Sequence, residues 1–395
     1  MRTVNVQLQT SIHDSFRVRQ VAGMFDLPVR PTAGILFGAE IPDESDDWQI
    51  GLIVGPSGSG KTSIARAAFG SRVYQPADWP TDKAVIDCLG DHPIKQITRT
   101  LTAVGFSSPP SWVKPYGVLS TGEKFRCDLA RALLGSCAAP STLFPPLPSG
   151  EGRRPALPPK MTVFDEFTSV VDRTVARIGS AAISKAIRIG LVETRFVAVT
   201  CHYDVLRWLQ PDWVLDMSGP SLCRGRLRRP PIVLEIRRVS RALWPRFARH
   251  HYLTGMLHRS SQCFAGFVEG QPAAFTAVLP FPHPIRPGWR EHRTVCLPDF
   301  QGVGIGTALS EFIASLFIAT GKPYFSTTSH PAMIHHRTKS ELWKMIRKPG
   351  MTARSGVTSA ATTGMSQTNS RGRNTAGFEY VGPPRTKDAR KFGIV

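Results

Sequence analysis

Short runs of hydrophobic and β-branched residues recur through the first half of the chain, and each ends at a glycine-rich or polar turn. Runs of about four to eight such residues are typical of buried strands when helical patterns lie between them. The pattern predicts strands at residues 48–54, 72–76, 161–167, 196–200 and 213–217. Residues 1–47 are poorly periodic, and we expect them to lead into this sheet.

The second half has a different order of elements, beyond a linker of arginine and proline at 228–231. A strand at 232–236 and a basic, aromatic helix at 242–253 are predicted first. The later elements are a hairpin with strands at 263–268 and 272–278, a strand at 293–297, an apolar helix at 307–320, and strands at 324–328 and 378–382. This mixture predicts an α+β domain behind the α/β domain.

The chain therefore divides into a lead-in at 1–47, an α/β domain at 48–227, an α+β domain at 232–382 and a basic tail at 383–395. Proline and glycine crowd residues 135–160, which we expect to be a disordered insertion. Ser, Thr, Gly and Ala dominate residues 349–375, which we expect to be a flexible insertion. The insertion at 135–160 should be dispensable for chemistry.

A glycine-rich turn follows the strand at 48–54 and precedes a helical pattern. Its sequence, Gly-Pro-Ser-Gly-Ser-Gly-Lys-Thr-Ser, has the Gly-x4-Gly-Lys-Thr spacing whose backbone N–H groups surround a β-phosphate. Lys61 is expected to reach the β- and γ-phosphates, and the Thr62 hydroxyl to bind Mg²⁺. The turn predicts a nucleoside-triphosphate site formed by Gly55, Gly58, Gly60, Lys61, Thr62 and Ser63.

Two carboxylates, Asp165 and Glu166, end the strand at 161–167, and His202 follows the strand at 196–200. Phosphoryl transfer to water needs neutralised charge and an oriented nucleophile. Successive strand side chains point to opposite sides, so Asp165 is expected to face a metal and Glu166 the attacking water. The plainer alternatives are a solvated turn for the carboxylates and a core histidine for His202.

These motifs occur in an order that resembles the nucleotide-binding domain of ABC-type ATPases, over about residues 15–220. The resemblance implies that Gln75 senses Mg²⁺ and water, with Gln96 as a rival. It makes Leu119-Ser120-Thr121-Gly122-Glu123 the signature, in which Ser120 and Gly122 approach the γ-phosphate. It makes Asp165 the Mg²⁺ ligand, Glu166 the general base, Asp172 the dimer-loop aspartate and His202 the switch histidine.

The resemblance also implies an ATP-dependent homodimer, because the signature acts on ATP held by a partner subunit. The sequence departs from the family at two places. Gln75 follows Lys61 after only 14 residues, and Thr121 and Glu123 replace the usual glycine and glutamine. Phe25 or Phe37 is a candidate to stack on the adenine, although a core position is the commoner role for such an aromatic.

A second glycine-rich turn, at 301–306, lies between the strand at 293–297 and the helix at 307–320. Read alone, it is compatible with a tight turn. Its Gln-Gly-Val-Gly-Ile-Gly sequence resembles the pyrophosphate-binding segment of GNAT acyltransferases over about residues 232–345. The resemblance implies a GNAT-like α+β acyltransferase domain that binds acetyl-CoA or another acyl-CoA. Its predicted site residues are Gln301, Gly302, Val303, Gly304, Gly306 and Thr307.

No sequence marker identifies the base that such an acyl transfer needs. The candidates are His250, His251, Tyr252, Ser329 and His330, each also explained by a structural or substrate-contact role. The whole chain resembles a rare group of ABC-type ATPases fused to a predicted acetyltransferase. The acyltransferase half resembles Mom-type phage DNA-modifying proteins through its histidine-rich first helix, the turn at 299–302 and Ser329-His330-Pro331.

Charge changes this picture by suggesting the partner. The chain carries 49 Lys and Arg against 29 Asp and Glu, a net charge of +20. Residues 232–395 hold 22 basic and 8 acidic side chains, whereas residues 1–50 hold 4 and 7. A basic region of this kind attracts polyanions, with DNA first, although surface arginines in water explain it equally simply.

The seven cysteines are scattered singly without a Cys-x-x-Cys pair, which favours a reducing cytoplasm and argues against a zinc site. No apolar run approaches the ~20 residues that a membrane-spanning helix needs. The resulting hypothesis is an ATP-hydrolysing enzyme that also modifies nucleic acid from acyl-CoA. Acetylation of a protein or small amine, and a non-catalytic nucleic-acid clamp, are the alternatives.

Overall fold

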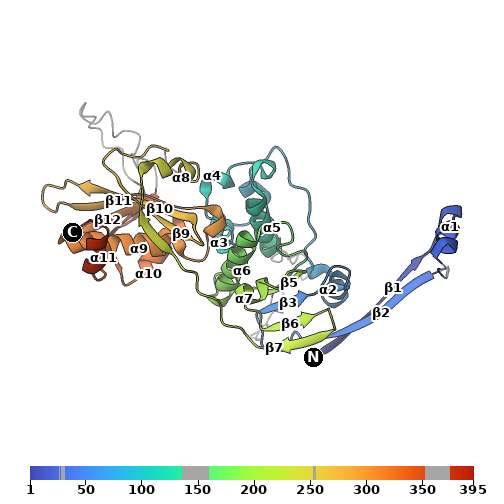
Figure 1. Ribbon diagram of the computed structural model, residues 1–395. Coiled ribbons are helices and arrows are strands. Elements are labelled where there is room, and N and C mark those ends of the chain that lie inside the picture. The colour runs from blue at the N-terminus through green and yellow to red at the C-terminus, as the bar shows by residue number, and fades with distance from the viewer. Residues whose placement is uncertain (26, 28–31, 136–159, 252–254, 352–373) are drawn as a thin grey trace, which may run out of the picture. The chain divides into compact units, whose positions relative to one another are not determined.

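The computed structural model describes residues 1–25, 27, 32–135, 160–251, 255–351 and 374–395 (Figure 1). The chain forms two compact units. The first comprises residues 1–76, 136–170 and 193–229, and the second comprises 77–135, 171–192 and 230–395. Most of the predicted insertions at 135–160 and 349–375 lies outside the described residues. No helix in the described part of the chain has the length and apolar character to cross a membrane.

A five-stranded sheet forms the centre of the first unit, in the order β4-β5-β3-β6-β7. Its strands are β3 (Ile50–Val54), β4 (Met161–Phe164), β5 (Arg195–Thr200), β6 (Trp213–Asp216) and β7 (Ser221–Arg224). The first four strands in the order are parallel, and β7 is antiparallel to β6. All five β3 residues are buried, as expected for a parallel strand that is covered on both faces.

Within residues 1–47, which the sequence predicts to be a lead-in to the sheet, two strands form a long hairpin. β1 (Arg2–Ser11) pairs antiparallel with β2 (Thr32–Ile41) along ten residues, and α1 (Phe16–Phe25) lies at its far end (Figure 1). Val4, Val6, Ala39 and Ile41 are buried near the sheet, whereas the outer half is exposed. Val4, Val6 and Leu8 alternate with polar residues along β1, a strand signal that the interpretation of residues 1–47 as poorly periodic missed.

Three helices cover the remainder of the first unit and its connections. They are α2 (Lys61–Phe69), the 3-10 turn η1 (Gly70–Arg72) and α7 (Val205–Leu209). The predicted strand at 72–76 is reduced to a single parallel bridge between Val73 and Val163 of β4. Val73, Val163, Ile64 and Trp213 are buried in one cluster with Trp48.

The second unit begins with helices taken from the middle of the chain. These are η2 (Val85–Cys88), α3 (Ile94–Ala103), α4 (Pro109–Trp112), η3 (Tyr116–Val118), α5 (Thr121–Gly135) and α6 (Arg173–Arg188). They belong to the same compact unit as the C-terminal sheet. The sequence-based division at 227–232 does not anticipate this grouping, since it rests on distant residues that pack together.

A seven-stranded sheet completes the second unit, in the order β13-β14-β12-β11-β10-β9-β8. The strands are β8 (Glu235–Arg238), β9 (Gln262–Val268), β10 (Gln271–Phe281), β11 (Gly288–Cys296), β12 (Tyr324–Thr328), β13 (Trp343–Met351) and β14 (Asn374–Tyr380). Every neighbouring pair is antiparallel except β11 and β12. The predicted hairpin at 263–278 and the strand at 324–328 are therefore confirmed.

The parallel pair is short. β11 and β12 are paired in register only at Trp289↔Tyr324 and Arg290↔Phe325, and the strands separate beyond these residues. The turn η5 (Pro298–Phe300) and helix α9 (Ile305–Phe317) connect them, followed by η6 (Ile318–Thr320). α9 packs on the sheet through buried apolar side chains, among them Leu309, Ile313 and Phe317.

Three further helical segments flank this sheet. They are η4 (Arg241–Leu243) with α8 (Pro245–Ala248), α10 (Pro331–Lys339) and α11 (Thr386–Lys391). The predicted helix at 242–253 is much shorter in the structure. Phe247 and Trp244 are buried against Phe275 of the sheet, so packing of two aromatic rings determines this segment more than helical periodicity does.

Candidate functional site

The first glycine-rich loop lies between β3 and α2, as the sequence predicts. Gly58 and Gly60 have φ of 79° and 86°, a left-handed conformation that glycine adopts without steric cost. The first N–H groups of α2 have no partner within the helix and carry its positive partial charge. Main-chain donors at a helix N-terminus bind anions, so the loop has the geometry for a phosphate group.

Side chains of the loop are compatible with a nucleotide. Lys61 Nζ donates to the Pro56 carbonyl at 2.7 Å, which holds the ammonium over the loop. Ser59 Oγ is buried and has no hydrogen-bond partner among the described residues. Thr62 and Ser63 lie half-buried in the first turn of α2. A buried hydroxyl and an ammonium group beside main-chain donors suit phosphate oxygens.

Of the two aromatic candidates for adenine stacking, Phe37 is the one beside the loop. A Cβ built on Gly60 would lie 2.5 Å from the Phe37 ring, so glycine is required for this close approach. Phe25, at the end of α1, is 66% exposed, and α1 has no buried residue. Of these two candidates, the structure therefore brings Phe37 to the glycine-rich loop.

The predicted carboxylates and histidine leave the sheet at the same edge as the loop. Val54 of β3 is paired in register with Thr200 of β5, and Phe164 of β4 with Ala198. The loop, Asp165-Glu166 and His202 follow these parallel strands, so all three emerge at their carboxyl ends. This is the edge at which ligands bind in open α/β sheets.

Asp165 and Glu166 differ in backbone conformation and in exposure. Glu166 has φ of 53°, a left-handed conformation that is uncommon for a residue other than glycine. Its N–H donates to Asp165 Oδ1 at 2.9 Å, and Glu166 is exposed while Asp165 is half-buried. A strained residue at a strand end is compatible with two carboxylates that have different tasks.

Gln75 and His202 also have defined places. Gln75 is exposed two residues beyond the bridge between Val73 and Val163, so it lies at the edge occupied by Asp165. Its rival Gln96 lies in α3 of the second unit. The His202 N–H donates to Thr200 Oγ1 at 3.2 Å, which fixes the backbone at the end of β5.

The predicted signature forms the start of α5 in the second unit. The Ser120 N–H donates to Glu123 Oε2 at 3.0 Å, and the Glu123 N–H donates to Ser120 Oγ at 3.3 Å. This reciprocal pair is a capping box, which explains glutamate at position 123. Burial alone would raise the pKa of Glu123, but hydrogen bonds from Ser120 and Ser111 lower it below its usual value.

Asp172 caps another helix of the second unit. Its Oδ1 accepts from the Thr174 and Val175 N–H groups at 2.9 and 3.0 Å, at the N-terminus of α6. N-cap aspartates of this kind stabilise a helix by about 1 kcal/mol. The structure thus gives Asp172 a structural contact, and its dimer-loop role stays a prediction.

The second glycine-rich turn also lies between a strand and a helix. Gly304, with φ of 101°, precedes the first residue of α9. The Gly306 N–H contacts the Cys296 sulfur, although burial still raises the pKa of that thiol to about 12. Val303, Gly304 and Thr307 are half-buried, so the N-terminal turn of α9 is accessible. These residues suit an anion at the helix N-terminus.

Gln301 and Gly302 have partners inside the protein. Gln301 Oε1 accepts from the Ser107 N–H, and Gln301 Nε2 donates to the Cys296 carbonyl at 2.8 Å. A Cβ on Gly302 would lie 2.6 Å from the Ala182 Cβ and 2.9 Å from the Gly105 Cα. Packing against the helices therefore accounts for the glutamine side chain and for glycine at 302.

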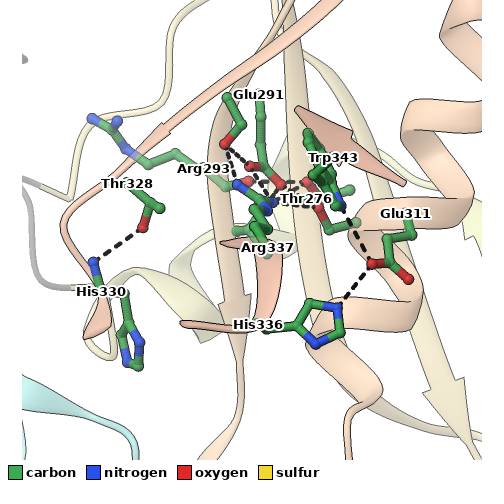
Figure 2. Close-up of polar contacts among 12 residues, drawn as sticks. Thr276, Glu291, Arg293, Glu311, Thr328, His330, His336, Arg337 and Trp343 are labelled. Carbon is green, nitrogen blue, oxygen red and sulfur yellow. Dashed lines mark hydrogen bonds and ion pairs between the residues drawn. The ribbon is translucent and has the colours of Figure 1, made fainter. Parts of the chain in front are cut away.

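A buried polar cluster that sequence reasoning missed lies where β11 and β12 separate (Figure 2). Arg337 Nη2 of α10 donates to Glu291 Oε2 at 2.9 Å and to Ser310 Oγ at 2.8 Å. Ser326 and Thr294 donate to the same carboxylate. Burial would raise the pKa of Glu291, but Arg337 and the three hydroxyls hold it below its usual value.

The described candidates for a catalytic base have different surroundings. His330 Nε2 lies 3.0 Å from the Ser107 carbonyl, and burial lowers the pKa of this histidine. Burial also lowers the pKa of His250, while Tyr252 lies outside the described residues. His292, which the sequence analysis did not select, has its pKa lowered to about 3 by burial and by neighbouring cations. Within the described chain, no His, Cys, Asp and Glu group of three has metal-binding geometry.

No family model and no curated protein matches this chain. Among solved structures it is similar to a bacterial ABC exporter with ATP bound, at 16% identity and a TM-score of 0.31, over 44% of this chain and 33% of the exporter. A dimeric bacterial ABC transporter cassette matches at 14% identity and a TM-score of 0.32, over 48% of this chain and 89% of the cassette. A dimeric ATP-binding cassette with ADP and phosphate bound matches at 13% identity and a TM-score of 0.36, over 57% of this chain and 99% of that cassette.

The chain thus spans about a third of the exporter's length and nearly all of each cassette.

Proposed function

We propose that this chain is an ATP-hydrolysing protein of the ABC type that works as an ATP-dependent homodimer. The observation that carries the proposal is the shared sheet edge. A phosphate loop with left-handed Gly58 and Gly60 follows the buried strand β3. The carboxylate pair and His202 follow its parallel neighbours in register.

Each residue has a role in hydrolysis. The loop amides and Lys61 bind the β- and γ-phosphates, and Phe37 stacks on the adenine. Thr62 and Asp165 would hold Mg²⁺, which supplies charge neutralisation at the phosphates. Glu166 accepts a proton from the attacking water. The water oxygen bonds to the γ-phosphorus as the P–O bond between the β- and γ-phosphates breaks. ADP and phosphate are the products, and His202 contacts the γ-phosphate side of the site.

The test is the Glu166→Gln variant, with Glu193→Gln as the control because Glu193 is an exposed glutamate of the same unit. We expect Glu166→Gln to lose at least about 100-fold in turnover, the usual effect of removing a general base. ATP binding and ATP-dependent dimerisation should remain. Turnover equal to that of Glu193→Gln would refute the role of Glu166.

We further propose CoA-dependent acyl transfer as a second activity, located in the domain of the C-terminal sheet. It is antiparallel except for the adjacent pair β11 and β12, which separate at the end where α9 begins. The amides from Val303 to Thr307 would bind the CoA diphosphate. An acceptor amine would attack the thioester carbonyl and form a C–N bond as the C–S bond breaks. The amine proton would pass to the leaving CoA thiolate, which departs as the thiol.

Binding of acetyl-CoA tests this activity. Thr307→Glu adds a negative charge to the first turn of α9, where it favours the helix but repels a diphosphate. Ala308→Glu places the same charge on the next, exposed position and serves as the control. We expect calorimetry to show loss of binding in Thr307→Glu alone. Equal affinity in both variants and the wild type would remove the acyl-CoA site.

The acceptor is proposed to be nucleic acid, with DNA first, on the basis of the net charge of +20. Mass spectrometry of nucleosides from cells with and without the protein should then reveal a modified base. Duplex DNA binding should weaken steeply with salt, because phosphate contacts release counterions. Absent or salt-insensitive binding would favour a protein or small amine as acceptor.

A further inference from the structure

We propose that Asp299 is a positioning residue for the signature at residues 119–123. Through Asp299, ATP binding by the dimer controls the turn that precedes α9. This inference rests on the proposed ATPase function, and its second readout also rests on the proposed acyl-CoA site. It concerns a carboxylate of the C-terminal sheet region, which no step of the proposed hydrolysis or acyl transfer uses.

Asp299 lies directly against the signature. A Cβ built on Gly122 would be 3.2 Å from Asp299 Oδ1. Arg126, one turn along α5, bridges the two: its Nη1 donates to the Gly122 carbonyl at 3.2 Å and lies 3.6 Å from Asp299 Oδ1. The carboxylate thus approaches both the peptide backbone of the signature and the cation that holds it.

The contact is electrostatically incomplete. The Arg126 side chain is fully buried, yet its Nε and Nη2 have no hydrogen-bond partner among the described residues. The Asp299 side chain remains 49% exposed. A buried guanidinium with unused donors is costly unless another acceptor is supplied. Arg126 can therefore change partners with little loss of bonding.

The same turn is tightly joined to the helices on its other side. Gln301 accepts from the Ser107 N–H, and a Cβ on Gly105 would lie 2.8 Å from the Gln301 carbonyl. Gly302 packs against Ala182 of α6 with no room for a side chain. Close-packed contacts of this kind transmit displacement instead of absorbing it. The turn leads within three residues to the N-terminus of α9.

The physical effect follows from charge. A γ-phosphate that approaches Ser120 and Gly122 brings negative charge close to Asp299 and Arg126. The Asp299 carboxylate repels this phosphate, and the Arg126 guanidinium attracts it. Binding at the signature should then shift Arg126 away from Asp299 and release the turn before α9. By linkage, an acyl-CoA bound at the N-terminus of α9 must affect ATP-driven dimerisation in return.

The experiment compares Asp299→Asn with Glu269→Gln. Both lose one carboxylate of the same unit, but Glu269 pairs with Arg177 of α6 at 2.8 Å and does not touch the signature. Dimerisation of the full chain is measured against ATP concentration, in the Glu166→Gln background to prevent turnover. We expect Asp299→Asn to dimerise at an ATP concentration at least about fivefold lower, a typical lower bound for site coupling.

A second readout separates positioning from simple stability. Acetyl-CoA affinity is measured with and without ATP. We expect ATP to change this affinity in the wild type and in Glu269→Gln, and to have no effect in Asp299→Asn. Thermal unfolding of the two single variants should be alike.

Two outcomes would overturn the inference, and they are distinguishable. If Glu166→Gln dimerises with ATP, and adding Asp299→Asn or Glu269→Gln leaves the required ATP concentration unchanged, Asp299 has no positioning role. If Glu166→Gln does not dimerise with ATP and the wild type does not hydrolyse ATP, the proposed function fails and the inference fails with it.

Discussion

Glu291 of β11 and Arg337 of α10 form a buried ion pair, with Oε2 and Nη2 2.9 Å apart and both side chains less than a tenth exposed (Figure 2). The guanidinium also lies 4.1 Å from the Trp343 ring centroid. The pair lies where the two parallel strands stop pairing. It therefore supplies polar contacts that bridge strands no longer joined by main-chain hydrogen bonds.

Removing one partner of this pair should be strongly destabilising. We expect Glu291→Gln and Arg337→Met each to lower the free energy of unfolding by about 3–5 kcal/mol, because each leaves a buried group without its partner. The double variant should lose clearly less than the sum of the two. Urea unfolding measures this. Additive losses would mean that the pair does not act as a unit.

The same carboxylate predicts a loss of stability in acid. The folded pKa of Glu291 lies below its ordinary value of 4.5, so the unfolded chain takes up the proton first as pH falls. The contribution of Glu291 to the free energy of unfolding is complete above its ordinary pKa. This contribution is lost as pH falls through the lower pKa of the folded state. Unfolding measured from pH 7 downward should show this loss, and Glu291→Gln should lack that component.

Gly302 and Gly270 form a matched pair for testing the packed turn. Both have positive φ, at 89° and 77°. A Cβ on Gly302 would meet Ala182 and Gly105, whereas one on Gly270 has nothing within 4 Å. We expect Gly270→Ala to cost about 1 kcal/mol from backbone strain, and Gly302→Ala about 1–3 kcal/mol more from overpacking. Equal unfolding midpoints would show that the helices do not constrain the turn.

Phe37 and Phe25 test the adenine contact. Phe37→Ala should weaken ATP binding about tenfold, since an aromatic stack contributes roughly 1 kcal/mol or more, while Phe37→Trp should retain it. Phe25→Ala provides the control, because that ring is 66% exposed. Fluorescent-nucleotide titration measures the affinities. Equal affinity in Phe37→Ala and Phe25→Ala would place the adenine elsewhere.

Local sequence determined those parts of the site that depend on neighbouring residues. Lys61 and Thr62 follow β3 at fixed spacing, and Glu166 follows β4, because a buried strand and a glycine turn are encoded in a few consecutive positions. Strands such as Tyr324–Thr328 were predictable for the same reason. The hairpin of β1 and β2 was missed although Val4, Val6 and Leu8 alternate with polar residues along β1, because most of its residues face water and β2 shows no such alternation.

Only the tertiary structure decided which distant residues share an environment. Periodicity cannot show that Ser107 bonds Gln301, that Asp299 lies against Gly122, or that Arg337 neutralises Glu291. A hydrogen bond or an ion pair depends on distance and desolvation in space, and both are set by packing of segments far apart in the chain. The sequence thus determined the two glycine-rich turns between strand and helix, and the fold decided what each of them touches.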